Sequence, residues 1–134
     1  MKYLSLDIGK KRIGIALSLA GTFCKEYKTL DFTTSDNLIS DIKTIITENN
    51  IDAIIIGLPK NMDGSDSEYT LYVREIADKI KTKITIPINL EDERLTSAEA
   101  ERQLQEMGLA RDEIKKRVDQ YAAKLILEQY LENK

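Results

Sequence analysis

The sequence begins with two short apolar runs joined by a polar turn, and this pair constrains the fold most. Residues 3–6 (YLSL) lead into Asp7, Gly9 follows two residues later, and residues 13–17 (IGIAL) form the second run. Short apolar runs on either side of a glycine-containing turn are typical of a β-hairpin. Carboxylates are depleted in strands and are seldom buried without a partner. Asp7 is therefore expected either to cap the turn or to point into a functional site.

The rest of the chain alternates between helical and strand patterns. A third strand is expected within residues 22–32, and apolar spacings of three and four predict the helices that follow. In chain order we expect a helix ending at 49–50, a strand over 52–57, a helix through 69–80, a strand over 84–88 running into 89–94, a helix from a capping box at 96–99 to Gly108, and a helix over about 112–131. A meander followed by βαβα units predicts an α/β fold, with a mixed sheet flanked by helices in one domain, 1–134.

Composition limits the chemistry. The chain has 134 residues, 42% of them hydrophobic and 32% charged, as expected for a globular protein with one core. It contains no histidine, which excludes histidine-based triads and histidine-rich zinc sites. The single cysteine, Cys24, cannot form an internal disulfide and is expected to pack in a strand. Catalysis would have to use carboxylates, lysines, hydroxyls or a bound ion.

Charge and hydropathy indicate the cellular setting. No apolar run approaches the roughly 20 residues that span a bilayer, and the N-terminus lacks the apolar stretch of a signal peptide. We therefore expect no membrane partner and a cytoplasmic location. A net charge of −3 argues mildly against a surface coated with positive charge for nucleic acid, but it is compatible with a local basic patch.

Acidic residues end the first and last predicted strands. Asp7 ends the first strand, and Asp92 and Glu93 end the last. Ligands of open α/β sheets gather outside the carboxyl ends of the strands, so these acids should meet if both strands lie near the sheet's centre. Successive side chains of a strand point to opposite faces, so only one of Asp92 and Glu93 can readily join Asp7.

A further acid, Asp119, lies on the apolar side of the last predicted helix. At about 100° per residue, it lies about 100° from Val118, within an apolar arc that extends to Ala123 at about 140°. A lone carboxylate there costs several kcal/mol unless it is paired or binds a cation. Pairing with Lys115 or Lys116, one turn earlier, is the structural alternative.

Together, the three acids suit a divalent-ion site better than three separate structural roles. The separate roles would be turn capping for Asp7, an ion pair with Arg94 or a lysine for Glu93, and a helix ion pair for Asp119. Mg²⁺ prefers oxygen ligands, and two ions about 4 Å apart can activate water and stabilise the leaving oxygen in phosphodiester cleavage.

Four segments carry a family resemblance. They are residues 7–14 (DIGKKRIG), 57–64 (GLPKNMDG), 92–97 (DERLTS), and Asp119 followed by Ala122 and Ala123. In this order they closely resemble the YqgF/RuvX-like family of nucleases, and the resemblance covers essentially the whole chain. It implies a ribonuclease H-like fold, in which an antiparallel three-strand meander continues into parallel strands, related in architecture to the RuvC Holliday-junction resolvases.

The resemblance also implies a site and a substrate. The metal-binding catalytic set would be Asp7, Glu93 and Asp119, with Asp92 as the alternative second acid. The implied cofactor is Mg²⁺ or Mn²⁺, as two ions. The implied substrate is nucleic acid, either the precursor of 16S ribosomal RNA during 5′-end maturation or branched DNA such as a Holliday junction. Both monomer and homodimer remain open, and junction resolution would favour a two-fold dimer.

Several polar residues near these acids are predicted to contact phosphates, which positions a nucleic acid without reading its sequence. They are Lys10, Lys11, Arg12, Lys60, Asn61 and Arg94. The alternatives are a solvated hairpin tip, a plain surface loop at residues 58–67, and a role for Arg94 in orienting a carboxylate. Four basic residues of the last helix are expected to form a solvated face, with phosphate contact as the second interpretation: Arg111, Lys115, Lys116 and Arg117.

The sequence gives less support to two other classes of function. Asp-x-Gly at a strand-to-hairpin turn also occurs in actin and sugar-kinase folds, but those enzymes close two domains around a nucleotide and this chain is expected to form one. A non-catalytic nucleic-acid-binding module is disfavoured, because three acids without a metal form a costly cluster of like charges.

Overall fold

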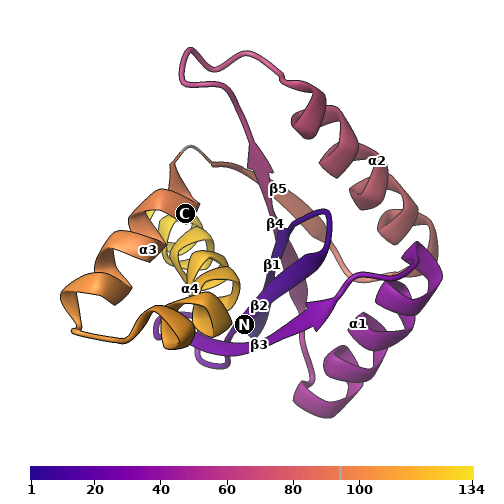
Figure 1. Cartoon of the computed structure of the whole chain (residues 1–134). Helices are drawn as coiled ribbons and strands as arrows, with labels where there is room; N and C mark the ends of the chain where they lie inside the picture. Colours follow the sequence, from indigo (N-terminus) through magenta and orange to yellow (C-terminus); the bar gives the residue numbers. More distant parts are fainter. Residues whose placement is uncertain (94) are drawn as a thin grey trace.

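A mixed sheet separates two helical layers in the computed structural model, which describes residues 1–93 and 95–134 (Figure 1). Its elements in chain order are β1 (Tyr3–Ile8), β2 (Arg12–Ser18), β3 (Lys25–Asp31), α1 (Ser35–Asn49), β4 (Ala53–Pro59), α2 (Glu68–Lys83), β5 (Ile88–Glu93), α3 (Thr96–Glu106) and α4 (Arg111–Glu132). The strand order is β3-β2-β1-β4-β5, with β1, β2 and β3 antiparallel and β1, β4 and β5 parallel. The predicted α/β class and mixed sheet are confirmed.

The two faces of the sheet carry different kinds of side chain. Branched aliphatic residues of β1, β2 and β4 form one cluster with α1 and α2; among them are Leu6, Ile8, Ile13, Ile15, Ile54 and Ile56. The alternate positions face α4 and include small residues. Ser5 Oγ donates a hydrogen bond to the Ala123 carbonyl at 2.7 Å, and a Cβ on Gly14 would lie 1.9 Å from the Asp119 carbonyl oxygen. These small residues let the α4 backbone approach β1 and β2 closely.

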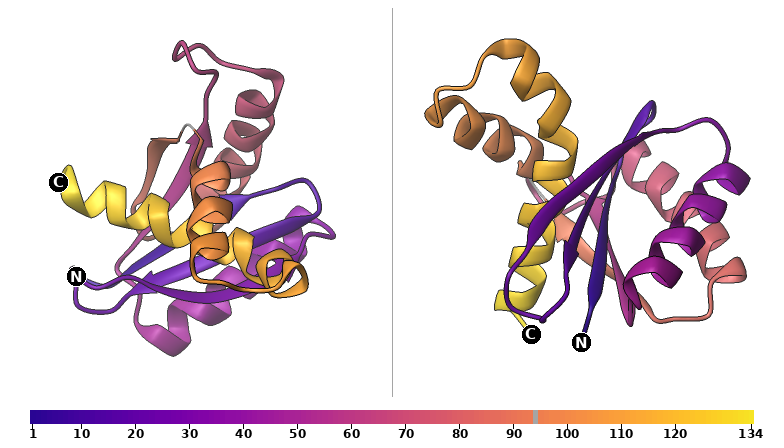
Figure 2. Two further views of the ribbon diagram at one scale, coloured as in Figure 1. Left: turned by 60° about the vertical axis from the view of Figure 1, so that its left-hand side comes forward. Right: turned by 90° about the horizontal axis from the view of Figure 1, so that it is seen from below.

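Helix α3 lies outside α4 and does not form part of the main aliphatic core. Its Ala100 and Leu104 are buried against Tyr121 and Ala122 of α4, and the Tyr121 hydroxyl donates to the Gln103 side chain at 2.7 Å. Seen from below, α3 and α4 lie on one side of the sheet and α1 and α2 on the other (Figure 2). Among the described helices, none is both long and apolar enough to cross a membrane.

The prediction of a strand over 84–88 is wrong for all but its last residue. Helix α2 continues to Lys83, Ile84 forms its C-cap, and β5 begins only at Ile88. Pro87 precedes β5 and has no N–H to give to a sheet ladder, while its carbonyl accepts a hydrogen bond from the Ile54 N–H at 2.9 Å. Ile84 and Ile86 therefore belong to a connection that packs against the core, and only Ile88 is part of the strand.

The predicted capping box at 96–99 is also wrong. Thr96 is already helical, and the N-cap residue of α3 is Leu95, which provides no side-chain cap. The Thr96 N–H instead donates to Glu93 Oε1 at 3.1 Å. A capping box does occur at α2, where Ser67 and Thr70 bond reciprocally. Glu93 thus combines a place at the end of β5 with a contact at the start of α3.

Candidate active site

Three carboxylates approach one another on the α4 face of the sheet. Asp7 lies on this face because it alternates with Leu6 and Ile8, whose side chains pack in the opposite cluster. Its β2 partner in the register is Gly14, the residue against which the Asp119 backbone packs. The pKa of Asp7 is raised to about 7, first by burial and then by the negative charges of Glu93 and Asp119. The three acids therefore act on one another electrostatically.

Strand parity separates Glu93 from its neighbour Asp92. Ile88 and Leu90 of β5 pack against the α1/α2 cluster, so Glu91 and Glu93 lie on the α4 face, and Gln129 of α4 bonds Glu91 Oε2 at 2.6 Å. The Asp92 side chain is exposed and does not contribute to the Asp7 pKa. The condition that both strands lie near the centre of the sheet is met by β1 alone, because β5 is an edge strand. Glu93 nevertheless lies close enough to Asp7 for its negative charge to raise the Asp7 pKa.

Asp119 is paired with a residue distant in sequence. Arg12 Nε lies 2.7 Å from Asp119 Oδ2, with the two side chains 47% and 24% exposed. This hydrogen bond, together with the charge of Asp119, raises the pKa of Arg12. The alternative partners, Lys115 and Lys116, form no ion pair with Asp119 among the described residues. Asp119 is thus held by the β1–β2 hairpin, across the α4–sheet interface.

Glu93 is held at the start of α3 by the hydrogen bond from the Thr96 N–H. Leu95, between them, has φ of 61°, in the left-handed region that costs a residue with a Cβ roughly 1–2 kcal/mol. A carboxylate is favoured at a helix N-terminus because the free N–H groups and the helix dipole are positive there. The sharp change of direction at Leu95 brings this N-terminus back to Glu93.

The acid trio, defined as Asp7, Glu93 and Asp119, fits a divalent cation in its chemistry. All its donors are carboxylate oxygens, which Mg²⁺ and Mn²⁺ accept, and a cation would relieve the repulsion that raises the Asp7 pKa. In the present conformation, within residues 1–93 and 95–134, no three acidic or cysteine side chains are gathered closely enough to hold a metal ion. Asp119 is engaged by Arg12 and Glu93 by the Thr96 N–H.

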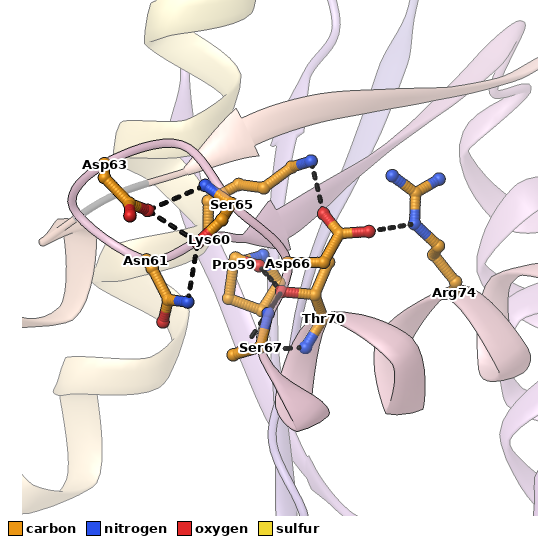
Figure 3. A network of polar contacts seen from close by, with 9 residues as sticks. All are labelled: Pro59, Lys60, Asn61, Asp63, Ser65, Asp66, Ser67, Thr70 and Arg74. Atoms are coloured by element: carbon orange, nitrogen blue, oxygen red, sulfur yellow. Dashed lines mark hydrogen bonds and ion pairs between the residues drawn. The ribbon is translucent and has the colours of Figure 1, made fainter.

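The loop after β4 contains two residues that were predicted to contact phosphates, and both are bound within the loop (Figure 3). Lys60 Nζ lies 2.6 Å from Asp66 Oδ1, and the Lys60 side chain is only 13% exposed. Asn61 Nδ2 donates to Ser65 Oγ at 3.0 Å. Arg74 also approaches Asp66, at 3.7 Å. Phosphate contact by Lys60 and Asn61 remains a prediction, and it would require them to exchange these partners.

The other predicted phosphate contacts have more accessible positions. Lys10 and Lys11 are exposed in the β1–β2 turn, which is closed by a hydrogen bond from the Gly9 N–H to the Arg12 carbonyl at 2.9 Å. A Cβ on Gly9 would come within 2.6 Å of that carbonyl oxygen, so the turn requires glycine here. Arg94 lies outside the described residues.

Tyr69 of α2 belongs to the site, although its spacing in the sequence indicated only a helix core position. Its hydroxyl donates to the Ile8 carbonyl, next to Asp7, at 2.6 Å. The pKa of Tyr69 is raised to about 12, mainly by burial and then by the nearby Asp7, Tyr72, Glu93 and Asp119. The phenol therefore stays protonated and fixes the end of β1. Nothing in the sequence pattern indicated the hydroxyl's partner.

Tyr69→Phe is expected to lower the free energy of unfolding by about 1–2 kcal/mol, because it leaves a partly buried carbonyl without its donor. Chemical denaturation at pH 7 measures this change. Tyr72→Phe is the matched control, since no hydrogen bond of the Tyr72 hydroxyl is found among the described residues. Equal destabilisation by both substitutions would show that the bond to Ile8 has no special weight.

Comparison with known proteins identifies the family of this chain. Residues 1–133 match the family described as RuvX, Holliday junction resolvase. A protein of Maridesulfovibrio salexigens named "Putative pre-16S rRNA nuclease" is 42% identical over 132 residues, covering 98% of each chain. A protein of the same name from Oceanobacillus iheyensis is 41% identical over 137 residues, covering 100% of each. The chain belongs to the RuvX family.

Solved structures support the fold at a greater evolutionary distance. Thermus thermophilus RuvC in complex with a Holliday junction superposes with a TM-score of 0.58 at 8% identity, covering 99% of this chain and 95% of RuvC. The Fowlpox virus resolvase, also in complex with junction DNA, gives 0.52 at 16% identity, covering 99% and 98%. This likeness confirms the predicted ribonuclease H-like, RuvC-related architecture.

Proposed function

We propose that this chain is a metal-dependent endonuclease that cuts structured nucleic acid, with the precursor of 16S ribosomal RNA as its substrate. The observation that carries the proposal is the approach of Asp7, Glu93 and Asp119, from β1, β5 and α4, on one face of the sheet. The names of the full-length relatives support the RNA substrate. The proposal includes a cytoplasmic location and a single nuclease domain spanning residues 1–134.

The acid trio would hold Mg²⁺ or Mn²⁺, as two ions. When bound, the ions would supply an activated water and a stabilised leaving oxygen for phosphodiester hydrolysis. Other residues of the chain hold the three carboxylates in position. Tyr69 fixes the β1 end that carries Asp7, the N-terminus of α3 orients Glu93, and the Arg12 guanidinium holds Asp119.

The basic turn after β1 would position the substrate. Lys10 and Lys11 are exposed beside Asp7, so they can meet backbone phosphates on either side of the cut bond. Such contacts fix register and orientation without reading bases. The sequence contains two phenylalanines, six tyrosines and no tryptophan, which supports recognition of backbone and shape over stacking on unpaired bases.

The test is a cleavage assay that compares a 16S precursor fragment with a synthetic four-way DNA junction, each with Mn²⁺, Mg²⁺ or EDTA. We expect metal-dependent cleavage near the 5′ end of the mature RNA, at a rate well above junction cleavage. Preferential cutting of the junction would instead support the alternative, a Holliday junction resolvase, which the family's description favours. Absence of metal-dependent cleavage of both substrates would reject the nuclease proposal and leave a non-catalytic nucleic-acid-binding module.

A further inference from the structure

The start of α4 and the β1–β2 turn together form a shallow basic hollow beside the acid trio. Its lining consists of Arg12, Asp112, Lys115 and Lys116, and its volume is about 500 Å³. Three cations and one carboxylate face this hollow, on a chain whose net charge is −3. The positive charge is therefore concentrated locally, as an electrostatic footprint for an anion requires.

The two lysines of this hollow are free to bind a ligand. Lys115 and Lys116 are exposed, and neither has an ion-pair partner within the part of the chain that the structure describes. The next basic residue, Arg117, differs: its guanidinium is bound by Glu26 of β3 at 2.7 Å. Of the four residues of the predicted solvated face of α4, Arg111, Lys115 and Lys116 are exposed, and Arg117 is held by Glu26.

Arg12 joins the hollow to the acid trio. The same guanidinium lines the hollow and contacts Asp119, and Lys115 and Lys116 lie one helical turn before Asp119 on α4. A strand that passes the trio would therefore also reach the hollow. If a cation displaces Arg12 from Asp119, the freed guanidinium remains beside the two lysines and adds a third positive charge.

We propose that Arg12, Lys115 and Lys116 form a binding site for the backbone phosphates of the nucleic-acid substrate, next to the point of cleavage. The inference rests on the proposed function for the identity of the strand. Arginine suits a phosphate through its planar set of donors, and lysines act as point charges. Such a site adds affinity and orientation without sequence specificity.

The test measures binding without cleavage. Fluorescence anisotropy in EDTA, over a series of salt concentrations, gives the dissociation constant for the 16S precursor fragment and for the four-way junction. Lys115→Gln/Lys116→Gln is compared with Lys43→Gln/Lys81→Gln, a control with the same charge change on the exposed sides of α1 and α2. Arg12 is left intact, because its substitution would also free Asp119.

We expect the double substitution on α4, Lys115→Gln/Lys116→Gln (the α4 pair), to weaken binding several-fold at about 0.1 M salt. It should also reduce the slope of log K against log [salt] by about 1 to 2. The control should change the slope by less than half as much. In the metal-activated assay the α4 pair should raise KM and leave kcat within about twofold, since it removes binding shared by ground and transition states.

Each result decides the proposal. The phosphate site would be overturned if the α4 pair and the control gave the same slope of log K against log [salt], and if thermal melting showed that both variants are folded. This holds even if the wild-type protein cleaves RNA. A reduced slope for the α4 pair supports the site even if no cleavage is found, in which case only the proposed nuclease function fails. A fall in kcat with KM unchanged would contradict the binding role assigned to the lysines.

Discussion

Asp7→Asn is expected to lower the rate of metal-dependent cleavage by at least about a hundredfold. The same substitution should make the metal-free protein more stable at pH 8. The asparagine keeps the shape of the side chain but removes one of the three negative charges that would hold the cation. It also removes a largely buried charge whose ionisation is opposed by burial, by Glu93 and by Asp119. Activity and stability should therefore change in opposite directions.

The stability difference should depend on pH in a defined window. The pKa of Asp7 rises from 3.8 to about 7 on folding, so between these values the folded chain keeps a proton that the unfolded chain releases. Stability conferred by this group is complete below pH 3.8 and is lost as pH rises toward 7, by roughly 4 kcal/mol in total. Asp7→Asn does not suffer this loss, so its advantage should be absent near pH 4 and complete at pH 8.

Thermal melting in EDTA at pH 4 and pH 8 measures this effect, and the expected gain at pH 8 is roughly 10 °C in Tm. Mn²⁺ should raise the wild-type Tm more than that of Asp7→Asn, because a ligand stabilises only the state that binds it. Asp92→Asn is the control, since that exposed acid lies on the other face of β5. Wild-type cleavage by Asp7→Asn would remove Asp7 from the catalytic set.

Gly14→Ala is expected to be the most damaging single substitution for the fold of the site. Its Cβ would lie 1.9 Å from the Asp119 carbonyl oxygen and 2.7 Å from the Gln120 nitrogen, which are backbone atoms of α4. Either β2 or the whole helix must move, so the loss of stability should reach at least about 3 kcal/mol. The same movement carries Asp119 away from Arg12 and from Asp7, and cleavage should fall with it.

Gly57→Ala provides the matched control on β4, which is separated from β2 by β1. There the added Cβ would meet the end of the Ile126 side chain, at 2.5 Å from Cδ1, and a side chain can change rotamer where a backbone cannot. We expect a loss of about 1–2 kcal/mol. Urea denaturation of the two variants compares them, and a Gly14→Ala protein as stable as Gly57→Ala would mean that α4 does not pack as closely as described.

Many features of this protein are determined by local sequence patterns. The hairpin at residues 3–17, the helix that ends near Asn49 and the buried β4 all follow from apolar periodicity, which reflects which side chains must leave water. The same periodicity placed Asp119 within the apolar side of α4. Periodicity failed at Ile84 and Ile86, which lie in the connection before β5, and the capping-box pattern failed at Thr96, because Leu95 is the N-cap residue of α3.

The site itself depends on contacts between distant segments. The sequence identifies Asp7, Glu93 and Asp119 as candidate metal ligands. The choice between Glu93 and Asp92 depends on which face of β5 lies toward α4. Lys115 and Lys116 were the nearest available partners for Asp119, yet the tertiary structure assigns Arg12, 107 residues away in sequence. It likewise assigns Asp66 to Lys60 and the Ile8 carbonyl to Tyr69.

There is a physical reason why some of these features follow from the sequence and others only from the tertiary structure. The spacing of apolar residues is a local property of the sequence. The sequence alone therefore determines most of the helices and strands, the carboxylates at their ends, and a set of candidate metal ligands that contains carboxylate oxygens and no histidine. Which charges meet depends on strand order, on strand parity and on how closely α4 can approach Gly14, and these are properties of the packed whole. Only the tertiary structure placed Arg12 on Asp119 and left two lysines unpaired beside it.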